Sequence, residues 1–78
     1  MRVSEVYEQL AKLPVESYGQ QCALSEVAEL TIHDTMVYVK PYDPTRVDYL
    51  EKKIMKCDLG VTPSNDGRGV RVPIPQQG

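Results

Sequence analysis

The 78-residue chain carries a formal net charge of −2, from nine Lys and Arg against eleven Asp and Glu. This length allows one small domain with a single modest core, and 41% hydrophobic with 26% charged residues is typical of a globular chain. A domain that holds nucleic acid by neutralising phosphates normally has a positive excess, so at most weak RNA binding is expected. No apolar run of about 18 residues and no signal-peptide pattern occurs, so neither a membrane span nor secretion is expected.

The first 13 residues are predicted to form a short helix, because apolar side chains recur at intervals of three and four. These side chains are Val3, Val6, Leu10 and Leu13. Ser4 is the expected N-cap, and Pro14 ends the helix. A helix this short is marginal alone, so it needs a packing partner inside or outside the chain.

Three short strands are expected next, at Val15–Tyr18, at about 27–32 and at 36–39. Residues 20–23 are expected to be a connection, followed by a turn of helix or irregular structure at Ser25-Glu26. His33-Asp34 is the expected turn between the second and third strands. Pro41 should end the third strand, since it cannot donate to a ladder.

The main helix is predicted at about 46–57. Thr45 and Asp48 resemble a capping box, and Asp48 should also pair with Lys52 one turn later. The apolar stripe consists of Val47, Leu50, Ile54 and Cys57. Lysines gather near the C-terminal end of the dipole, and Gly60 ends the segment. One stripe can bury only one side, so this helix should lie across a sheet.

The remaining chain predicts a hairpin, because Asp66-Gly67 is a strong two-residue turn signal. Val70–Val72 alternates as a final strand, and Pro73 and Pro75 hold the chain extended. The order helix, strand, strand, strand, helix, strand predicts an α+β fold. We expect a small β/α/β sandwich, with one main helix packed on mixed short strands and a short N-terminal helix.

No catalytic fingerprint is present, and we expect neither an enzyme nor a cofactor. Gly67-Arg68-Gly69 is interpreted as a hairpin tip, the alternative being a phosphate or RNA contact through Arg68. His33-Asp34 is interpreted as a solvated turn, since no nucleophile stands beside it. Three aspartates, Asp34, Asp43 and Asp66, sit at turns or caps and could meet around a cation only by chance. Cys22 and Cys57 are interpreted as thiols, with a disulfide left open.

From Glu51 to Gly67, and again at Val70-Arg71-Val72-Pro73-Ile74-Pro75, the sequence resembles the ribosome recycling factor family. That family's pattern is Glu-Lys-Ala-Ile, Ser-Asp-Leu-Gly-Leu-Asn-Pro, a glycine and Ile-Arg-Val-Pro-Ile-Pro. Upstream, 15–19 is similar to Val-Glu-Tyr-Tyr-Gly, and 40–43 to Gln-Pro-Trp-Asp. The resemblance covers about 15–75, with several motifs in the right order.

The chain departs from the pattern at single positions: Thr62 replaces Asn, Cys57 replaces Ser, and Ala23 stands where a Pro precedes Leu24. The turn at His33-Asp34 is about two residues shorter than the family's. The sequence stops at Gly78, where the family continues into two long helices.

The resemblance implies a two-domain factor, in which a three-helix bundle binds ribosomal RNA and a β/α/β domain is inserted between bundle helices. Residues 14–75 resemble that second domain, 1–13 a remnant of the first bundle helix, and 76–78 a tail at the truncated junction. The full factor recycles post-termination ribosomes with elongation factor G and GTP, without covalent chemistry. It is implied to be cytoplasmic in a bacterium, or mitochondrial or plastid in a eukaryote, and this domain to be monomeric.

In that setting the domain is the mobile part that faces elongation factor G. The expected partner contacts are Lys52, Lys56, Arg68 and Arg71. The expected inter-domain junction consists of Pro14, Val15, Glu16, Pro73 and Pro75. An inserted domain has neighbouring ends, so Val15–Tyr18 should lie close to Val70–Ile74, and could pair with it. A free-standing protein- or RNA-contact module with the same sandwich remains the alternative.

Overall fold

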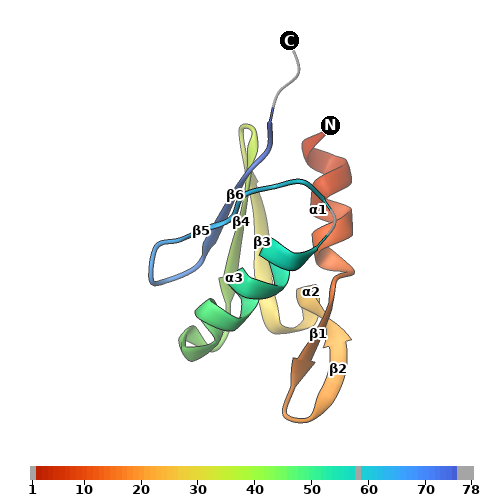
Figure 1. Cartoon of the computed structure of the whole chain (residues 1–78), viewed down its shortest axis with the longest axis vertical. Coiled ribbons are helices and arrows are strands. Elements are labelled where there is room, and N and C mark those ends of the chain that lie inside the picture. Colours follow the sequence, from red (N-terminus) through yellow and green to blue (C-terminus); the bar gives the residue numbers. More distant parts are fainter. Residues whose placement is uncertain (1, 58, 76–78) are drawn as a thin grey trace.

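A computed structural model describes residues 2–57 and 59–75 (Figure 1). The helices are α1 (Val3–Ala11), α2 (Leu24–Val27), the 3₁₀ turn η1 (Pro44–Arg46) and α3 (Val47–Lys56). The strands are β1 (Pro14–Ser17), β2 (Gln20–Ala23), β3 (Ala28–His33), β4 (Met36–Pro41), β5 (Ser64–Asn65) and β6 (Val70–Pro73). The fold is α+β, as predicted. The expected tail at 76–78 lies outside the described residues.

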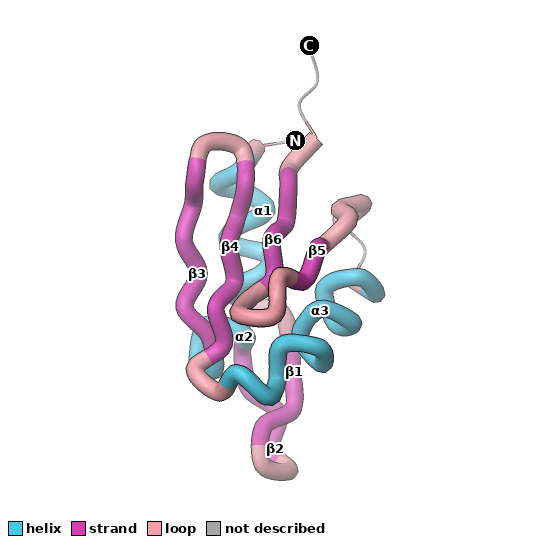
Figure 2. Tube along the Cα trace, turned by 90° about the vertical axis from the view of Figure 1, so that its left-hand side faces the viewer, coloured by secondary structure: helices cyan, strands magenta, loops and turns pink. Residues whose placement is uncertain are grey.

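A four-stranded antiparallel sheet, in the order β3-β4-β6-β5, forms one layer (Figure 2). Val37 pairs with Val72 and Val39 with Val70, and all four side chains are buried. Successive strand residues point to opposite faces, so Tyr38 and its neighbours lie on the other face of the sheet. Only the valine face is covered by helices (Figure 1).

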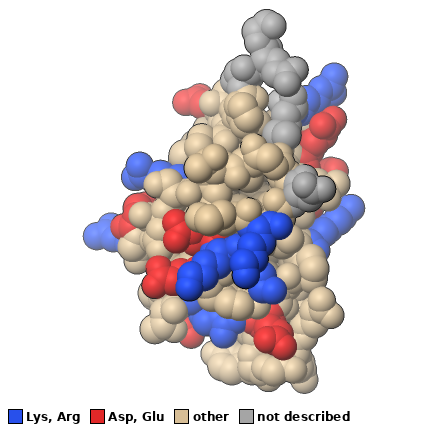
Figure 3. Space-filling model, in the orientation of Figure 1, with Lys and Arg blue, Asp and Glu red and all other residues tan. Residues whose placement is uncertain are grey.

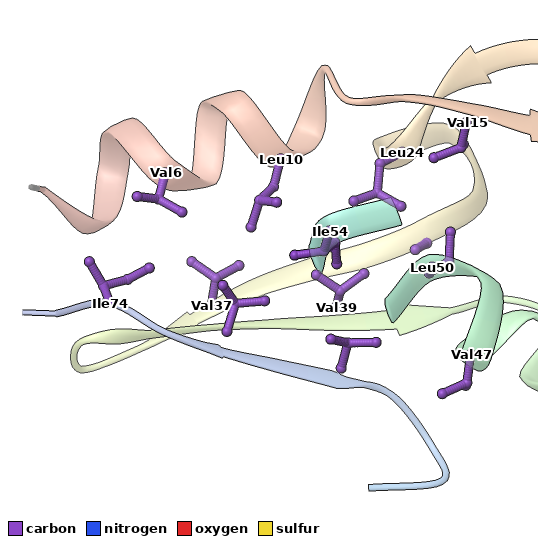
Figure 4. Packing of buried hydrophobic residues seen from close by; sticks show 13 residues of the cluster. Val6, Leu10, Val15, Leu24, Val37, Val39, Val47, Leu50, Ile54 and Ile74 are labelled. Atoms are coloured by element: carbon purple, nitrogen blue, oxygen red, sulfur yellow. The ribbon is translucent and has the colours of Figure 1, made fainter. Parts of the chain in front are cut away.

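Helix α1 covers one half of the valine face, where it packs against β3 and β4. Val6 and Leu10 are fully buried, and Val6 lies beside Ile74 (Figure 4). Val3 and Leu13 are half-buried against the same core, so the predicted apolar face is confirmed. The packing partner that the sequence left open is therefore the domain's own sheet.

Helix α3 covers the other half and contacts β4, β5 and β6. Val47, Leu50 and Ile54 are buried in the same cluster as the α1 residues, and Cys57 is half-buried at its edge. The predicted stripe is confirmed. The helix lies across the sheet, so α1, α3 and the strands β3, β4 and β6 share one core (Figure 4).

Strands β1 and β2 form a separate two-stranded hairpin that projects from the end of the sheet (Figure 1). The turn consists of Tyr18 and Gly19, both with positive φ, at +52° and +78°. Positive φ at both central residues defines the type I′ turn, whose twist suits a hairpin. The segment 20–23, expected to be a connection, is therefore a strand.

The predicted capping box at Thr45 and Asp48 is wrong. Asp43 caps the segment instead: its Oδ1 accepts from the N–H of Thr45 at 3.0 Å and from the Thr45 hydroxyl at 2.7 Å. Pro44 follows this cap and opens the 3₁₀ turn, so α3 begins only at Val47. Ser4 is likewise no cap, because α1 begins at Val3 and its cap residue is Arg2.

The predicted two-residue turn at Asp66-Gly67 is also wrong, although the hairpin itself is confirmed. Asn65 pairs with Val70, so four residues form the loop between β5 and β6. The N–H of Asp66 donates to the carbonyl of Gly69 at 3.1 Å and closes it. Strand β4 includes Pro41 as its last residue, two beyond the expected strand.

The predicted proximity of Val15–Tyr18 to Val70–Ile74 is wrong. Strand β1 pairs only with β2, whereas β6 lies between β4 and β5. Val15 and Ile74 lie at opposite ends of the core (Figure 4). The two ends of the fold do lie close together, but through the start of α1 and the end of β6 (Figures 1 and 2).

Candidate functional site

The exposed face of α3 carries three lysines, Lys52, Lys53 and Lys56. They follow from the sequence because Leu50 and Ile54 take the buried side of the same turns. Basic side chains gather over this helix on the surface (Figure 3). They are stabilised near the C-terminal end of the helix dipole, and Lys52 and Lys56 are exposed where they can meet an acidic surface.

Tyr49 connects this helix to the β1–β2 hairpin. Its hydroxyl accepts a hydrogen bond from the N–H of Glu16 at 2.8 Å, and the Arg46 guanidinium donates to the carbonyl of Glu16. Arg46 and Lys53 lie over the Tyr49 ring, with their charged groups 4.4 Å and 5.6 Å from its centroid. Two hydrogen bonds of the Glu16 backbone therefore fix the hairpin to η1 and α3, and the cation–π contacts order the Tyr49 and Arg46 side chains that make them.

Arg71 lies on the uncovered face of the sheet, opposite Tyr38 in the ladder. Its Nε is 3.6 Å from Oδ2 of Asp66, and the Tyr38 hydroxyl donates to the same carboxylate at 3.2 Å. The pKa of Asp66 is lowered, mainly because its carboxylate accepts hydrogen bonds from the N–H groups of Arg68 and Gly69. Burial, followed by the neighbouring Asp66 charge, raises the pKa of Tyr38.

Arg68 is exposed in the β5–β6 loop, and the loop's backbone donors are occupied from within. The N–H of Gly67 donates to Oδ1 of Asn65, and the N–H groups of Arg68 and Gly69 donate to Oδ1 of Asp66. A phosphate-binding loop needs free backbone donors. The structure therefore favours the hairpin tip over a phosphate cradle at 67–69.

The four expected contact residues form two surfaces. The α3 surface is Lys52 and Lys56, whereas Arg71 is on the opposite side of the sheet, because its neighbours Val70 and Val72 face the helices. The predicted ion pair between Asp48 and Lys52 is absent from the described residues. Asp48 Oδ1 instead accepts from the amide of Asn65 at 2.6 Å and ties α3 to β5.

The five expected junction residues also fall into two separate places. Pro14, Val15 and Glu16 follow α1 and lead into the hairpin, with Val15 buried. Pro73 and Pro75 are exposed at the far end of β6. There the N–H of Ile74 donates to the carbonyl of Thr35 at 2.8 Å, which holds β6 against the β3–β4 turn.

Sequence reasoning missed a cavity of about 210 Å³ between the hairpin turn, α2, η1 and α3. Its lining includes Tyr18, Glu26, Val27, Tyr42, Asp43 and Arg46. These residues come from the hairpin turn, α2, the loop after β4 and η1, so no single motif could have shown it. The one local signal was an aromatic residue beside Gly19 in a hairpin turn.

Other candidate chemistry is absent from the described part of the chain. No three His, Cys, Asp or Glu side chains there gather as metal ligands, and none of its helices has the length and apolarity to cross a membrane. His33 is exposed, with Nε2 3.3 Å from the Thr31 hydroxyl. Cys22 and Cys57 are free thiols, and Cys57 donates to the carbonyl of Ile54.

The fold and these surfaces define a small two-layer α+β domain that offers exposed cations and tyrosines for contact. Residues 3–77 match the sequence profile of a family described as "Ribosome recycling factor". The chain belongs to this family, as the motifs predicted. Proteins of that name from Bacillus licheniformis and Shouchella clausii are 48% and 45% identical over 67 residues. In each case the match covers 85% of this chain and 36% of the relative, so the chain spans little more than a third of their length.

Two solved structures are similar. A solution structure of the ribosome recycling factor aligns with a TM-score of 0.66 at 21% identity, covering 91% of this chain and 46% of that one. The other aligns with a TM-score of 0.66 at 35% identity, and the alignment covers 87% of this chain and 37% of that one. It describes the T. thermophilus ribosome recycling factor and E. coli elongation factor G bound to the E. coli post-termination complex.

Proposed function

We propose that this chain serves as the β/α/β domain of a ribosome recycling factor, acting with elongation factor G on post-termination ribosomes. The proposal depends on one observation: the family profile matches residues 3–77, yet the match covers only 36% of the length of the relative. The domain comprises 14–75, and 1–13 corresponds to the end of the first bundle helix. The relatives named above are bacterial, so we expect a cytoplasmic factor, monomeric and with weak RNA binding.

The contribution of the domain is mechanical, since a recycling factor needs no covalent chemistry of its own. Elongation factor G pushes on one cationic surface, and the shared core transmits that push as a rigid body. The candidates are the α3 surface, Lys52 and Lys56, and the sheet surface, Arg68 and Arg71. Because they lie on opposite sides of the sheet, one flat partner surface would use one of them and leave the other free.

The junction would transmit the push to the remainder of a longer factor. Prolines fix φ, so Pro73 and Pro75 stiffen one connection and Pro14 the other. The two connections are separated by the length of α1. The connection at Pro14 is anchored by the burial of Val15 and by the hydrogen bond between Glu16 and Tyr49.

The test replaces the matching segment of the Bacillus licheniformis factor with residues 3–75, so that α1 keeps its place in the core, and measures polysome breakdown with elongation factor G and GTP. We expect the chimaera to be active and the 78-residue chain alone to be inactive. Activity of the isolated chain, or an inert but folded chimaera, would contradict the proposal. The second result would favour a free-standing contact module.

Charge reversals in the chimaera then separate the two surfaces. Lys52→Glu with Lys56→Glu tests α3, and Arg68→Glu with Arg71→Glu tests the sheet. Lys12→Glu, an exposed position just after α1 and outside both surfaces, is the control for a charge reversal. We expect one of the two double variants to recycle ribosomes more slowly, and the dependence of its rate on elongation factor G concentration to change. Full activity of both double variants would show that none of the four residues contacts elongation factor G.

A further inference from the structure

The cavity beneath the hairpin turn has the character of a protein-contact site. It holds about 210 Å³, and its lining includes the buried Leu50 and the half-buried Val27. Two tyrosines stand at it, Tyr18 with 91% and Tyr42 with 68% of its surface exposed. Exposed tyrosines beside an apolar hollow are typical of protein interfaces.

The position of Tyr18 has a backbone cost. Its φ of +52° lies in the left-handed region, which a bulky side chain rarely adopts and which Asn or Gly would fill more easily. The ring gains no burial in return, since it is almost fully exposed. Folding alone therefore gives no reason for a tyrosine in this turn, whereas an external contact does.

Two carboxylates, Glu26 and Asp43, outnumber the single guanidinium of Arg46 and give the lining a net negative charge. Glu26 accepts from the N–H of Ala23 at 2.9 Å through Oε2, and Asp43 accepts from Thr45 through Oδ1. Each leaves one carboxylate oxygen without a hydrogen-bond partner among the described residues. The hydrogen bonds from Thr45 lower the pKa of Asp43, so it stays ionised at neutral pH.

Arg46 is the cation of this lining, and its charge contributes to the lowered pKa of Asp43, but its hydrogen bond and its ring contact are made outside the cavity. Arg46 donates to the carbonyl of Glu16 and lies over the ring of Tyr49, 4.4 Å from its centroid. Tyr49 thus already holds a cation on its face, whereas the rings of Tyr18 and Tyr42 hold none within the described structure. Two aromatic faces and two carboxylates are the chemistry that receives a guanidinium or ammonium group.

We propose that this cavity receives an arginine or lysine side chain from an extended segment of a partner protein, placed between Tyr18 and Tyr42 and paired with Glu26 and Asp43. Charge complementarity identifies the occupant. A phosphate-bearing nucleic acid would meet both carboxylates, and an apolar segment would leave them unpaired. The site includes none of the four residues of the two cationic surfaces.

The test titrates the labelled 78-residue chain with the peptide acetyl-Gly-Ser-Arg-Ser-Gly-amide and follows amide shifts in NMR spectra. Its matched control replaces Arg with citrulline, which has nearly the same shape but no charge. We expect shifts at Val27, Tyr42 and Asp43, and affinity about two- to fivefold weaker for citrulline. Equal affinity for both peptides, or no shift at these three amides, would overturn the proposal.

Three variants locate the contact. Tyr18→Asn removes the ring and suits the positive φ, so the fold should be at least as stable. Glu26→Gln removes the charge and keeps an oxygen that accepts from Ala23. Each of these two variants, and a third with Tyr42→Ser, should weaken binding of the arginine peptide about two- to fivefold. Ile32→Ser, at an exposed apolar position on β3, is the control. An equal loss in this control, or stronger shifts of the cavity amides by a short single-stranded RNA, would contradict the assignment.

Discussion

Gly69 shows how one residue can determine the conformation of a loop. A Cβ at this position would lie 2.7 Å from the Cζ and the hydroxyl of Tyr38 and from the carbonyl oxygen of Val39. The last contact is with backbone inside the sheet, which cannot swing away. Glycine therefore allows Tyr38 to lie over the loop and reach Asp66.

Gly69→Ala should consequently lower the free energy of unfolding by about 1–3 kcal/mol, the range for inserting a methyl group into packed structure. Urea denaturation measures this. Arg68→Ala, in the same loop but with an exposed side chain, is the control and should change stability by less than about 0.5 kcal/mol. If both variants match the parent, the close packing of Tyr38 on Gly69 is wrong.

Asp66 makes the loop sensitive to acid. Its pKa in the folded chain lies below the ordinary 3.8, so its contribution to stability is full above that ordinary value. The contribution is lost as pH falls through the folded pKa. Protonation removes the acceptor charge used by the N–H groups of Arg68 and Gly69, and the partner of Arg71.

We therefore expect stability to fall on acidification below about pH 4, and the fall to be smaller in Asp66→Asn. Denaturation measured from about pH 2 to 6 tests the slope. Part of the fall remains in the variant, because the pKa of Asp43 is also lowered. Identical slopes in parent and variant would show that Asp66 has no special role.

At the scale of elements, α3 shows what periodicity can predict. The spacing of Val47, Leu50 and Ile54 identified the buried stripe, and the structure places all three in the core. Leu50→Ala should cost about 2–5 kcal/mol, because the residue is 1% exposed and its removal leaves a cavity.

Met55→Ala is the matched control for Leu50→Ala. Met55 is in the same helix but 57% exposed, so its loss should cost less than about 0.5 kcal/mol. Chemical denaturation of the two variants side by side gives the difference. Equal losses would mean that α3 is not oriented by its apolar stripe.

The elements that the sequence did not predict are those whose cause is non-local. Gln20-Gln21-Cys22-Ala23 has no apolar alternation, and it becomes a strand because the Tyr18-Gly19 turn brings it back onto β1. Ser64-Asn65 is too short and polar to signal a strand, and it is held by Arg71, Val70 and the contact of Asn65 with Asp48.

The candidate contact sites also differ in whether their cause is local or non-local. Lys52 and Lys56 could be predicted as exposed, since helix spacing alone separates them from the stripe. The cavity at Tyr18 and Tyr42 could not, because its walls meet only after the hairpin is fixed to α3 by Tyr49 and Arg46. The cap at Asp43 was missed because Pro44 and Thr45 form a 3₁₀ turn that shifts the helix start.

At the scale of the whole molecule, the shared core has a mechanical consequence. Val6 and Leu10 of α1, Leu50 and Ile54 of α3 and the valines of the sheet belong to one buried cluster. A force applied to α3 then moves the sheet and α1 together, since no element can shift without opening that core. This rigidity is what the proposed push by elongation factor G requires.

The rigidity can be measured by native-state hydrogen exchange. We expect amides in the middle of α1 and in β4 to exchange with the same opening free energy, because neither element can leave the core alone. Leu10→Ala should lower both values equally, by about 2–5 kcal/mol. Faster exchange of α1 with β4 unchanged would show a helix that detaches by itself. The push would then reach the rest of a longer factor through a loose connection at α1, and only β6 would transmit it rigidly.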